Sequence, residues 1–349
     1  MRKLSLFFSA AIACAVFGSQ VQTTKAQTPE QFYKGRTIKL ISGSTVGGGG
    51  DLMSRLVARF MAKHMPGQPV IAVQNLPGGG GLIGANRIAN AAPRDGSEFA
   101  AMERTVPQYA VMGDANARFD PLALTWLGSL SSYRDDAYML LLANTHPAKT
   151  VEDLRKPGIS ARLGASQQGS ANLTLTQIAR YVLDVNIIPI SGYSGTSKIA
   201  IAIQSGEVDG EMIGMSSVLS TQRHMWDSKF LRPLAQFARE TRHPALPDVP
   251  TARELVKDPD KLALLEFAEL SFFMARPFVA PAGIPADRAK ALRDAFMAAV
   301  HDPEYISESK KLEIDHSPID HVEIERLLRK AVATPKSVIA EFEKLVNRK

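Results

Sequence analysis

Two glycine-rich runs carry the clearest chemical signal in this sequence. Residues 47–50 are four consecutive glycines followed by Asp51, and residues 78–81 are four more. Each run lies between a short apolar segment that predicts a strand and a periodic segment that predicts a helix. Glycine has no Cβ, so backbone N–H groups at the amino end of a helix can closely approach an anion. Together the two runs could hold one carboxylate group.

The same runs disfavour nucleotide binding. A phosphate-binding P-loop needs Lys and Ser or Thr after its last glycine, whereas Asp51 and Leu52 follow here. Leu52 also takes the place of the third glycine in the dinucleotide fingerprint. The alternative to ligand binding is that the glycines only permit tight turns and that Asp51 caps a helix. Two copies of the pattern favour the ligand-binding interpretation.

The elements that must position these loops follow from the hydrophobic pattern. We predict strands at 37–41, 70–73 and near 99–102, with helices at 52–64 and 82–92 between them. This alternation predicts a parallel sheet with right-handed crossovers. In such sheets, ligands bind beyond the carboxyl ends of the strands, which is where both glycine runs fall.

Further along the chain, two more helix starts carry polar donors. A strand predicted at 161–165 leads through a polar segment into a helix that runs toward Leu183, and a second turn opens another helix. The candidate ligand-binding residues there are Ser166, Gln167, Ser170, Tyr193, Gly195 and Thr196. Ordinary helix caps use the same residue types, and this is the alternative interpretation.

Composition points to a globular protein that does not bind nucleic acid. The chain has 349 residues, of which 45% are hydrophobic and 22% charged, enough for a core divided between about two domains. Basic residues exceed acidic ones by six without forming a block, which argues against nucleic-acid binding. The lone Cys14 excludes an intramolecular disulfide and a cysteine-based zinc site.

Residues 1–26 have the pattern of an export signal. Two basic residues precede an uncharged apolar stretch at 4–18, and small residues suited to a signal peptidase end at Ala26. We predict cleavage after Ala26 and a soluble periplasmic protein, with lipidation of Cys14 as the alternative. Cleavage removes three basic residues, and the mild positive charge that is left suits an anionic small ligand.

A series of turn-rich motifs resembles one known family. They are GGGGDL at 47–52, NLPGGGGLIGA at 75–85, FDP at 119–121, YSG at 193–195, GEVD at 206–209, PALPDVPT at 244–251 and APAGIP at 280–285. In their order and spacing, over nearly the whole mature chain, they resemble the Bug-type extracytoplasmic solute receptors of tripartite tricarboxylate transporters.

The resemblance implies an α/β fold of the two-lobed type II periplasmic binding-protein class, with a hinge and an interlobe ligand cleft. Lobe I would comprise 27–130 plus 240–349, including the last helix after Pro335, and lobe II 131–239. The implied function is capture of a small organic carboxylate, either a di- or tricarboxylate or an aromatic acid. A monomer without a cofactor would deliver it to the large and small permease subunits of the transporter.

In the family, two lobe I glycine loops hold one carboxylate of the ligand, and a Ser- and Gly-rich lobe II segment contacts it. Departures here are Ser44 where an aromatic residue is common and Leu82 where Asn is common, so the pocket lining is altered. Neither position 213 nor 214 is acidic, which disfavours an α-amino acid ligand. The lobe I set is Ser44, Gly48, Gly49, Gly50, Asp51, Gly78, Gly79, Gly80 and Arg104.

Arg104 follows the third predicted strand and could pair bidentately with a second ligand carboxylate. The alternative is a salt bridge to Glu103 or another neighbour. No His-Glu-x-x-His zinc pattern and no Gly-x-Ser-x-Gly nucleophile motif occurs, so we assign no catalytic residue and no metal. The alternatives to a transport receptor are a periplasmic hydrolase or lyase on the same scaffold, and a ligand-loaded sensor.

Overall fold

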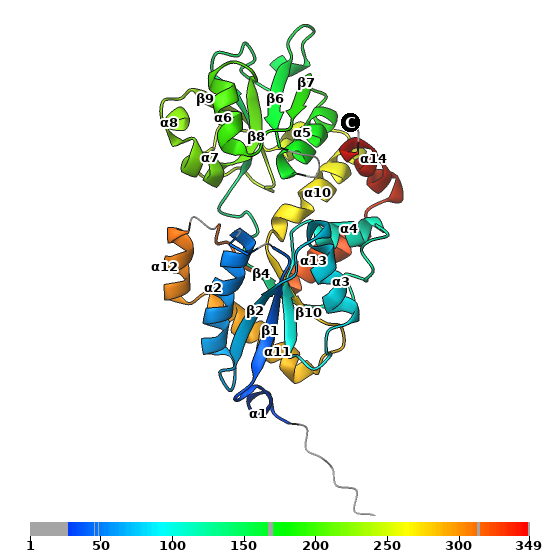
Figure 1. The fold of residues 1–349 in the computed structure, drawn as a ribbon. Helices are drawn as coiled ribbons and strands as arrows, with labels where there is room; N and C mark the ends of the chain where they lie inside the picture. Colours follow the sequence, from blue (N-terminus) through cyan, green and yellow to red (C-terminus); the bar gives the residue numbers. More distant parts are fainter. Residues whose placement is uncertain (1–26, 45, 48, 167–169, 313–314, 348–349) are drawn as a thin grey trace, which may run out of the picture.

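The computed structural model describes residues 27–44, 46–47, 49–166, 170–312 and 315–347, and it forms two lobes, each built on its own sheet (Figure 1). The predictions for residues 1–26, including Cys14, and for Gly48 and Gln167 fall outside these ranges. Within the described ranges, no helix combines the length and apolarity needed to cross a bilayer.

Six strands form the sheet of the first lobe. They are β1 (Thr37–Ser42), β2 (Val70–Asn75), β3 (Glu98–Ala101), β4 (Thr125–Ser129), β10 (Pro277–Ala280) and β11 (Ile319–Asp320). Their order is β11-β4-β10-β3-β1-β2, and β1 pairs in parallel with both β2 and β3. The predicted parallel unit is therefore confirmed, and β10 adds an antiparallel strand from the C-terminal part of the chain.

Helices pack on both faces of this sheet (Figure 1). They are α1 (Pro29–Tyr33), α2 (Gly49–His64), η1 (Gly79–Gly81), α3 (Leu82–Asn90), α4 (Val106–Met112), α11 (Ala286–Val300), α12 (Pro303–Lys311) and α13 (His321–Val332). The apolar stripe predicted for the first long helix is buried on one face, where Phe60 shares a core cluster with Phe296 of α11. Burial of this stripe, more than helix propensity, stabilises α2.

The second lobe has five strands in the order β7-β6-β8-β5-β9. They are β5 (Tyr138–Ala143), β6 (Ala161–Ala165), β7 (Ile187–Ser191), β8 (Gly210–Gly214) and β9 (Leu231–Phe237). The surrounding helices are η2 (Asp153–Arg155), α5 (Ala171–Val182), α6 (Thr196–Gln204), α7 (Met215–Thr221), α8 (Arg223–Asp227) and α9 (Ala252–Leu255). All six residues of β5 are buried, as expected for a central strand covered on both faces.

Two helices that follow β9 in the chain pack on the second lobe. They are α10 (Pro259–Phe273) and α14 (Lys336–Val346), and α14 lies against the upper lobe in Figure 1. Phe267 of α10 and Phe342 of α14 meet edge to face, with ring centroids 5.2 Å apart, in the same core cluster as Ile178 of α5. This packing departs from the predicted division, which put all of 240–349 in lobe I. An amphipathic face shows that a helix is buried but does not show which core it joins.

The segment that joins β4 to β5 is held by one buried guanidinium. Arg239, just after β9, donates hydrogen bonds to the backbone carbonyls of Tyr133 at 3.2 Å and of Arg134 and Asp136 at 2.6 Å each. These bonds tie the segment that joins the two lobes to the loop that follows β9 in the second lobe. We call this tied region the hinge.

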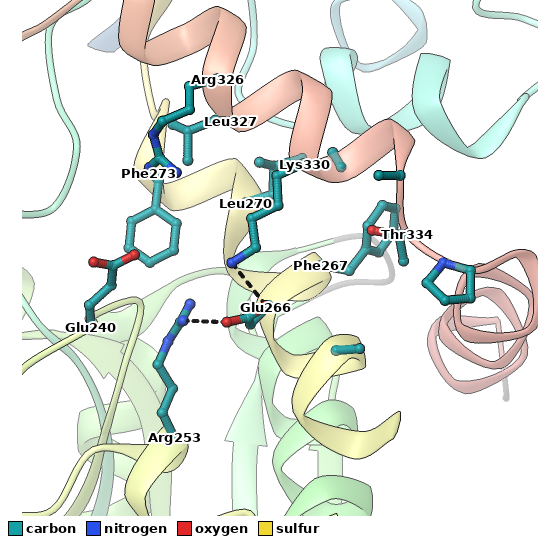
Figure 2. Close-up of a pocket in the computed structure, with 14 residues that line it drawn as sticks. Glu240, Arg253, Glu266, Phe267, Leu270, Phe273, Arg326, Leu327, Lys330 and Thr334 are labelled. Atoms are coloured by element: carbon teal, nitrogen blue, oxygen red, sulfur yellow. Dashed lines mark hydrogen bonds and ion pairs between the residues drawn. The ribbon is translucent and has the colours of Figure 1, made fainter. Parts of the chain in front are cut away.

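A second connection between the lobes lies where α10 meets α13. Figure 2 shows Glu266 between Arg253 and Lys330, and its carboxylate oxygens lie 2.9 Å from a nitrogen of each. Arg253 belongs to α9 and Lys330 to α13, so this chain of ion pairs joins the second lobe to the first. A cavity of about 280 Å³, lined largely by apolar side chains of α10 and α13, lies beside these pairs.

Glu211 of β8 is a fully buried carboxyl in the second lobe. Its Oε1 accepts a hydrogen bond from Nε2 of Gln222 at 2.5 Å, whereas Oε2 of Glu211 and Oε1 of Gln222 have no partner among the described residues. Burial raises the pKa of Glu211 to about 8. A protonated carboxyl suits this core, because a carboxylate would be a buried charge without a cation.

We predict that the stability of the protein falls as the pH rises from about 4.5 to about 8, through the Glu211 pKa. In that window the unfolded chain ionises this side chain, whereas the folded chain keeps its proton. Glu211→Gln should remove that part of the pH dependence. Urea unfolding measures the free energy of unfolding of both proteins at pH 5 and pH 8. The value for the variant minus that for the unmodified protein should rise by at least about 2 kcal/mol from pH 5 to pH 8. Parallel pH profiles for the two proteins would contradict this prediction.

Candidate functional site

The loops of the candidate site meet at one edge of the first sheet. Strands β1, β2 and β3 run parallel, so the loop after each strand emerges at the same edge. The first two loops touch through their backbones, because a Cβ built on Gly43 would lie 3.4 Å from Cα of Gly81. The third loop begins with Met102 and Glu103, directly after β3. The two predicted glycine runs are thus neighbours, with a third loop beside them.

Asp51 holds the first glycine loop in shape. Its Oδ2 accepts a hydrogen bond from the Gly47 N–H at 2.9 Å, and its Oδ1 accepts one from Nδ2 of Asn75 at 2.9 Å. The Arg55 guanidinium lies 3.0 Å from Oδ1, and the side chain of Asp51 is 2% exposed. Hydrogen bonds from Arg55 and Gly47 lower the pKa of Asp51 to about 2. Both carboxylate oxygens therefore accept hydrogen bonds from the protein itself, one from the first glycine loop and one from the end of β2.

The second glycine loop has a backbone that only glycine adopts readily. Gly78, Gly79, Gly80 and Gly81 all have positive φ angles, of 125°, 56°, 63° and 94°. The chain makes a tight turn closed by a 3.0 Å hydrogen bond from the Gly81 N–H to the Gly78 carbonyl, and then enters α3. Because the first three glycines are exposed, their backbone is accessible to a small molecule.

Glu103 lies between the two glycine loops. The Ser44 hydroxyl donates a hydrogen bond to its Oε1 at 2.6 Å. A Cβ built on Gly50 would lie 2.0 Å from Oγ of Ser44, and one built on Gly81 would lie 2.8 Å from Cγ of Glu103. The absence of side chains at these two glycines therefore makes the room that Ser44 and Glu103 occupy.

Two guanidiniums flank this carboxylate. Arg276, just before β10, lies 3.9 Å from Oε2 of Glu103, and its burial together with the neighbouring Arg104 lowers its pKa to about 10. Arg104 instead faces the hinge: it lies over the rings of Tyr133 and Phe272, at 5.7 and 5.4 Å from their centroids. The predicted alternative of an Arg104–Glu103 salt bridge is wrong in its partner, because the cation that meets Glu103 is Arg276.

A cavity between the lobes connects Arg104 to the second lobe. It has a volume of about 340 Å³, and its lining includes Arg104 and Gln108 from the first lobe and Ala171 and Thr174 from the first turn of α5. Helices α10 and α14, Asn347 and further first-lobe residues supply the rest of the wall, which includes two acidic residues, Asp114 and Glu343. The cavity therefore places Arg104 close to the amino end of α5, where two of the predicted lobe II residues lie.

The cavity shown in Figure 2 is less suited to an anion. Arg253 and Lys330 on its wall are paired with Glu266, and Arg326 forms two hydrogen bonds of 2.7 Å to Glu323. An acidic ligand there would have to compete with acidic groups of the protein. No group of three or more residues able to hold a metal ion occurs in the part of the chain that the structure describes.

In the second lobe, Ser166 and Ser170 are organised by the first turn of α5. The side-chain oxygen of Asn172 accepts hydrogen bonds from the Ser166 N–H at 3.2 Å and from the Ser170 hydroxyl at 2.7 Å. The Gly192 N–H donates to the Ser166 carbonyl at 3.3 Å, so the two predicted lobe II turns lie side by side.

The second of these turns makes its contacts within its own lobe. The Tyr193 hydroxyl donates a 2.5 Å hydrogen bond to Glu207, and burial together with this carboxylate raises the pKa of Tyr193 to about 12. Gly195 precedes α6, and Thr196 is the first residue of that helix. Among the described residues, no hydrogen bond or ion pair joins Tyr193, Gly195 or Thr196 to the glycine loops of the first lobe.

Sequence reasoning missed three residues at this site. Glu103 had a usable signal, because it follows a parallel strand at the edge where ligands bind. Asn75 stands beside a glycine run, but its role as a partner of Asp51 depends on the β1–β2 register. Arg276 is more than 170 residues beyond Glu103 along the chain, and only the pairing of β10 with β3 brings it there.

Comparison with known proteins agrees with this architecture. Residues 53–344 match the model of the tripartite tricarboxylate transporter family receptor. The protein BugT of Bordetella pertussis is 29% identical over 253 residues, which cover 69% of this chain and 73% of BugT.

Two solved structures show the same fold at low identity. A TctC solute-binding protein from Polaromonas is 20% identical, with a TM-score of 0.69 over 88% of this chain and 99% of that one. MatC from Rhodopseudomonas palustris, with bound malate, is 23% identical, with a TM-score of 0.53 over 89% of this chain and 99% of that one. The predicted two-lobed fold is confirmed. The match over most of the chain shows that this protein belongs to the receptor family of tripartite tricarboxylate transporters, whose members are solute-binding proteins rather than enzymes.

Proposed function

We propose that this protein is a periplasmic receptor that captures a small dicarboxylate between its lobes. The observation that carries the proposal is the contact between two glycine loops at the edge of three parallel strands, flanked by Arg104 and Arg276. Membership in the receptor family and the malate bound to MatC support a carboxylate as the ligand. The two guanidiniums favour a ligand with more than one negative charge.

One ligand carboxylate would bind at the glycine loops. The exposed backbone of Gly78, Gly79 and Gly80 and the amino end of the 16-residue helix α2 can supply N–H donors there. The Ser44 hydroxyl adds a side-chain donor at the same point. A second carboxylate would extend toward Arg104 along the interlobe cavity. The length of the ligand would then be set by the span between the loops and Arg104.

The second lobe would close on the exposed part of the ligand. Ser170 directly precedes α5, whose first turn borders the cavity that contains Arg104. Contacts to both lobes would favour the closed arrangement, because a ligand shifts such an equilibrium only through its differential affinity for the two states. Tyr193, Gly195 and Thr196 remain candidate contacts for this closed form.

We further propose that the receptor acts in the periplasm, after cleavage at Ala26, as a monomer that delivers its ligand to the large and small permease subunits. The family to which the chain belongs serves such transporters. A ligand-loaded receptor that docks on a sensor is the alternative partner arrangement. Pull-down of the tagged mature protein with membranes that contain the permease subunits distinguishes the two.

Titration calorimetry with succinate, malate, adipate, citrate and benzoate should show one binding site per chain for at least one dicarboxylate. We expect a Kd below about 1 mM, which corresponds to a binding free energy more favourable than about −4 kcal/mol. Glutamine and glucose serve as controls and should release no binding heat, because neither presents two carboxylates to the site. Absence of binding for every acid would contradict the proposed function.

Asp51→Asn should weaken dicarboxylate binding about tenfold, because it replaces a carboxylate oxygen that holds the first glycine loop with an amide group. The buried donors left without their acceptor should also lower the free energy of unfolding by about 1–3 kcal/mol. Calorimetry and urea unfolding measure the two effects.

The matched control is Asp294→Asn, which removes the same charge from an exposed pair with Lys290 on α11. It should change stability by less than about 0.5 kcal/mol and leave affinity unchanged. If Asp51→Asn binds as tightly as the unmodified protein, the shape of the first glycine loop does not contribute to binding.

A further inference from the structure

Glu103 contacts the features that the proposed function assigns to a ligand carboxylate. Its Oε1 accepts the Ser44 hydroxyl hydrogen bond at 2.6 Å and lies 3.5 Å from the position of a Cβ built on Gly50, in the first turn of α2. Its Cγ packs against Gly81 of the second loop, and Oε2 faces Arg276. A carboxylate of the protein itself therefore already occupies the space between the two loops.

Behind this carboxylate, little space is left. The cavity bordered by Ser44, Gly50, Glu103 and Arg276 has a volume of about 20 Å³, enough for roughly one water molecule. A ligand carboxylate can reach the Ser44 hydroxyl and this end of α2 only if the Glu103 side chain moves. Two carboxylates about 4 Å apart would also repel each other strongly in this partly buried site.

The contacts that hold Glu103 permit such a movement. Its side chain is 32% exposed, and its ion pair with Arg276 has a separation of 3.9 Å, close to the upper limit for such a contact. Among the described residues, the Ser44 hydroxyl supplies the one hydrogen bond to this carboxylate. By contrast, Asp51 nearby is 2% exposed and held by three partners. Outward rotation of Glu103 breaks few contacts.

The charges around Glu103 favour its replacement by a ligand anion over repulsion of that anion. Arg104 and Arg276 bring two positive charges to this region, where Glu103 faces Arg276 and Asp315 is a second acidic neighbour of Arg276. If Glu103 rotates outward, Arg276 is left without its carboxylate, and an incoming anion can take that place. Burial and the neighbouring Arg104 already disfavour the charged form of Arg276, so it gains from a new partner.

We propose that Glu103 is a resident carboxylate that competes with the ligand for the glycine-loop site and must be displaced when a ligand carboxylate binds there. The proposal rests on the proposed function and adds a residue that determines the affinity of the receptor for carboxylates. Displacement lowers affinity for every carboxylate, and it favours ligands whose second charged group is held by Arg104. Glu103 thereby weakens the binding of singly charged acids more than that of dicarboxylates.

Glu103 could instead bind the ligand directly, and the experiment would then give the opposite result. A carboxylate at this point could accept a hydrogen bond from a hydroxyl or ammonium group of the ligand. Removal of Glu103 would then weaken binding. The geometry favours displacement, because Glu103 already takes the Ser44 hydroxyl hydrogen bond between the glycine loops, and the cavity behind it has a volume of only about 20 Å³.

The test compares the Glu103→Gln and Glu103→Ala variants with the unmodified mature protein by calorimetry, with succinate and malate as probes. We expect both variants to bind about tenfold or more tightly, because neither carries the competing charge. We also expect a smaller preference for succinate over the monocarboxylate butyrate in both variants. Thermal unfolding confirms that each variant is folded before titration.

Glu304→Gln is the matched control. It removes one negative charge from the same lobe, at an exposed side chain paired with Lys63 in the last turn of α2, far along the helix from Gly50. Its affinity should equal that of the unmodified protein, so a gain confined to position 103 is local.

Unchanged or weaker binding by both Glu103 variants, while the unmodified protein binds succinate or malate, overturns the displacement proposal and leaves the proposed function standing. An equal gain in Glu304→Gln overturns it as well, because the effect would then reflect net charge alone. If neither the unmodified protein nor any variant binds a carboxylate, the proposed function fails and this proposal fails with it.

Discussion

The shared edge of three parallel strands is the constraint on which the candidate site depends. Because β1 pairs with both β2 and β3, the loops after all three strands must emerge together. The first two loops can then touch only where both backbones lack side chains, as at Gly43 and Gly81. Gly81, the last residue of the second glycine run, serves this close approach together with Gly43. Asp51 and Asn75 add a polar clamp that keeps the first loop against the end of β2.

This close approach also decides the electrostatics of the site. A space free of Cβ atoms admits the Glu103 side chain, which places a negative charge beside the amino end of α2. The antiparallel strand β10 then brings Arg276 to the other side of that charge. Of the two guanidiniums, Arg276 faces Glu103 and also has Asp315 as an acidic neighbour, whereas Arg104 faces the hinge.

The hydrophobic pattern predicted the local elements well and the long-range assembly less well. Strands and helices of the first βαβαβ unit lie within about three residues of their predicted bounds, because alternation and helical stripes are local signals. The glycine loops were found for the same reason. Arg276 could not be predicted, because its place beside Glu103 depends on strand pairing between distant parts of the chain. Helix α14 was assigned to the first lobe because an apolar helix face does not indicate which of the two cores it packs on. The interpretation of Arg104 missed that aromatic rings would take the place of an acidic partner.

Arg104 connects the site to the hinge. It follows β3 in the first lobe, yet its guanidinium lies over Tyr133, in the segment that joins β4 to β5, and over Phe272, at the end of α10. Arg239 bonds to the backbone of the same segment, so Tyr133 is held from two directions. An anion that draws Arg104 toward itself must alter its contacts with both rings, and these belong to two of the segments between the lobes. On the proposed function, a ligand charge at Arg104 would act on two of the segments between the lobes through these direct contacts, and only a ligand that reaches Arg104 could use them.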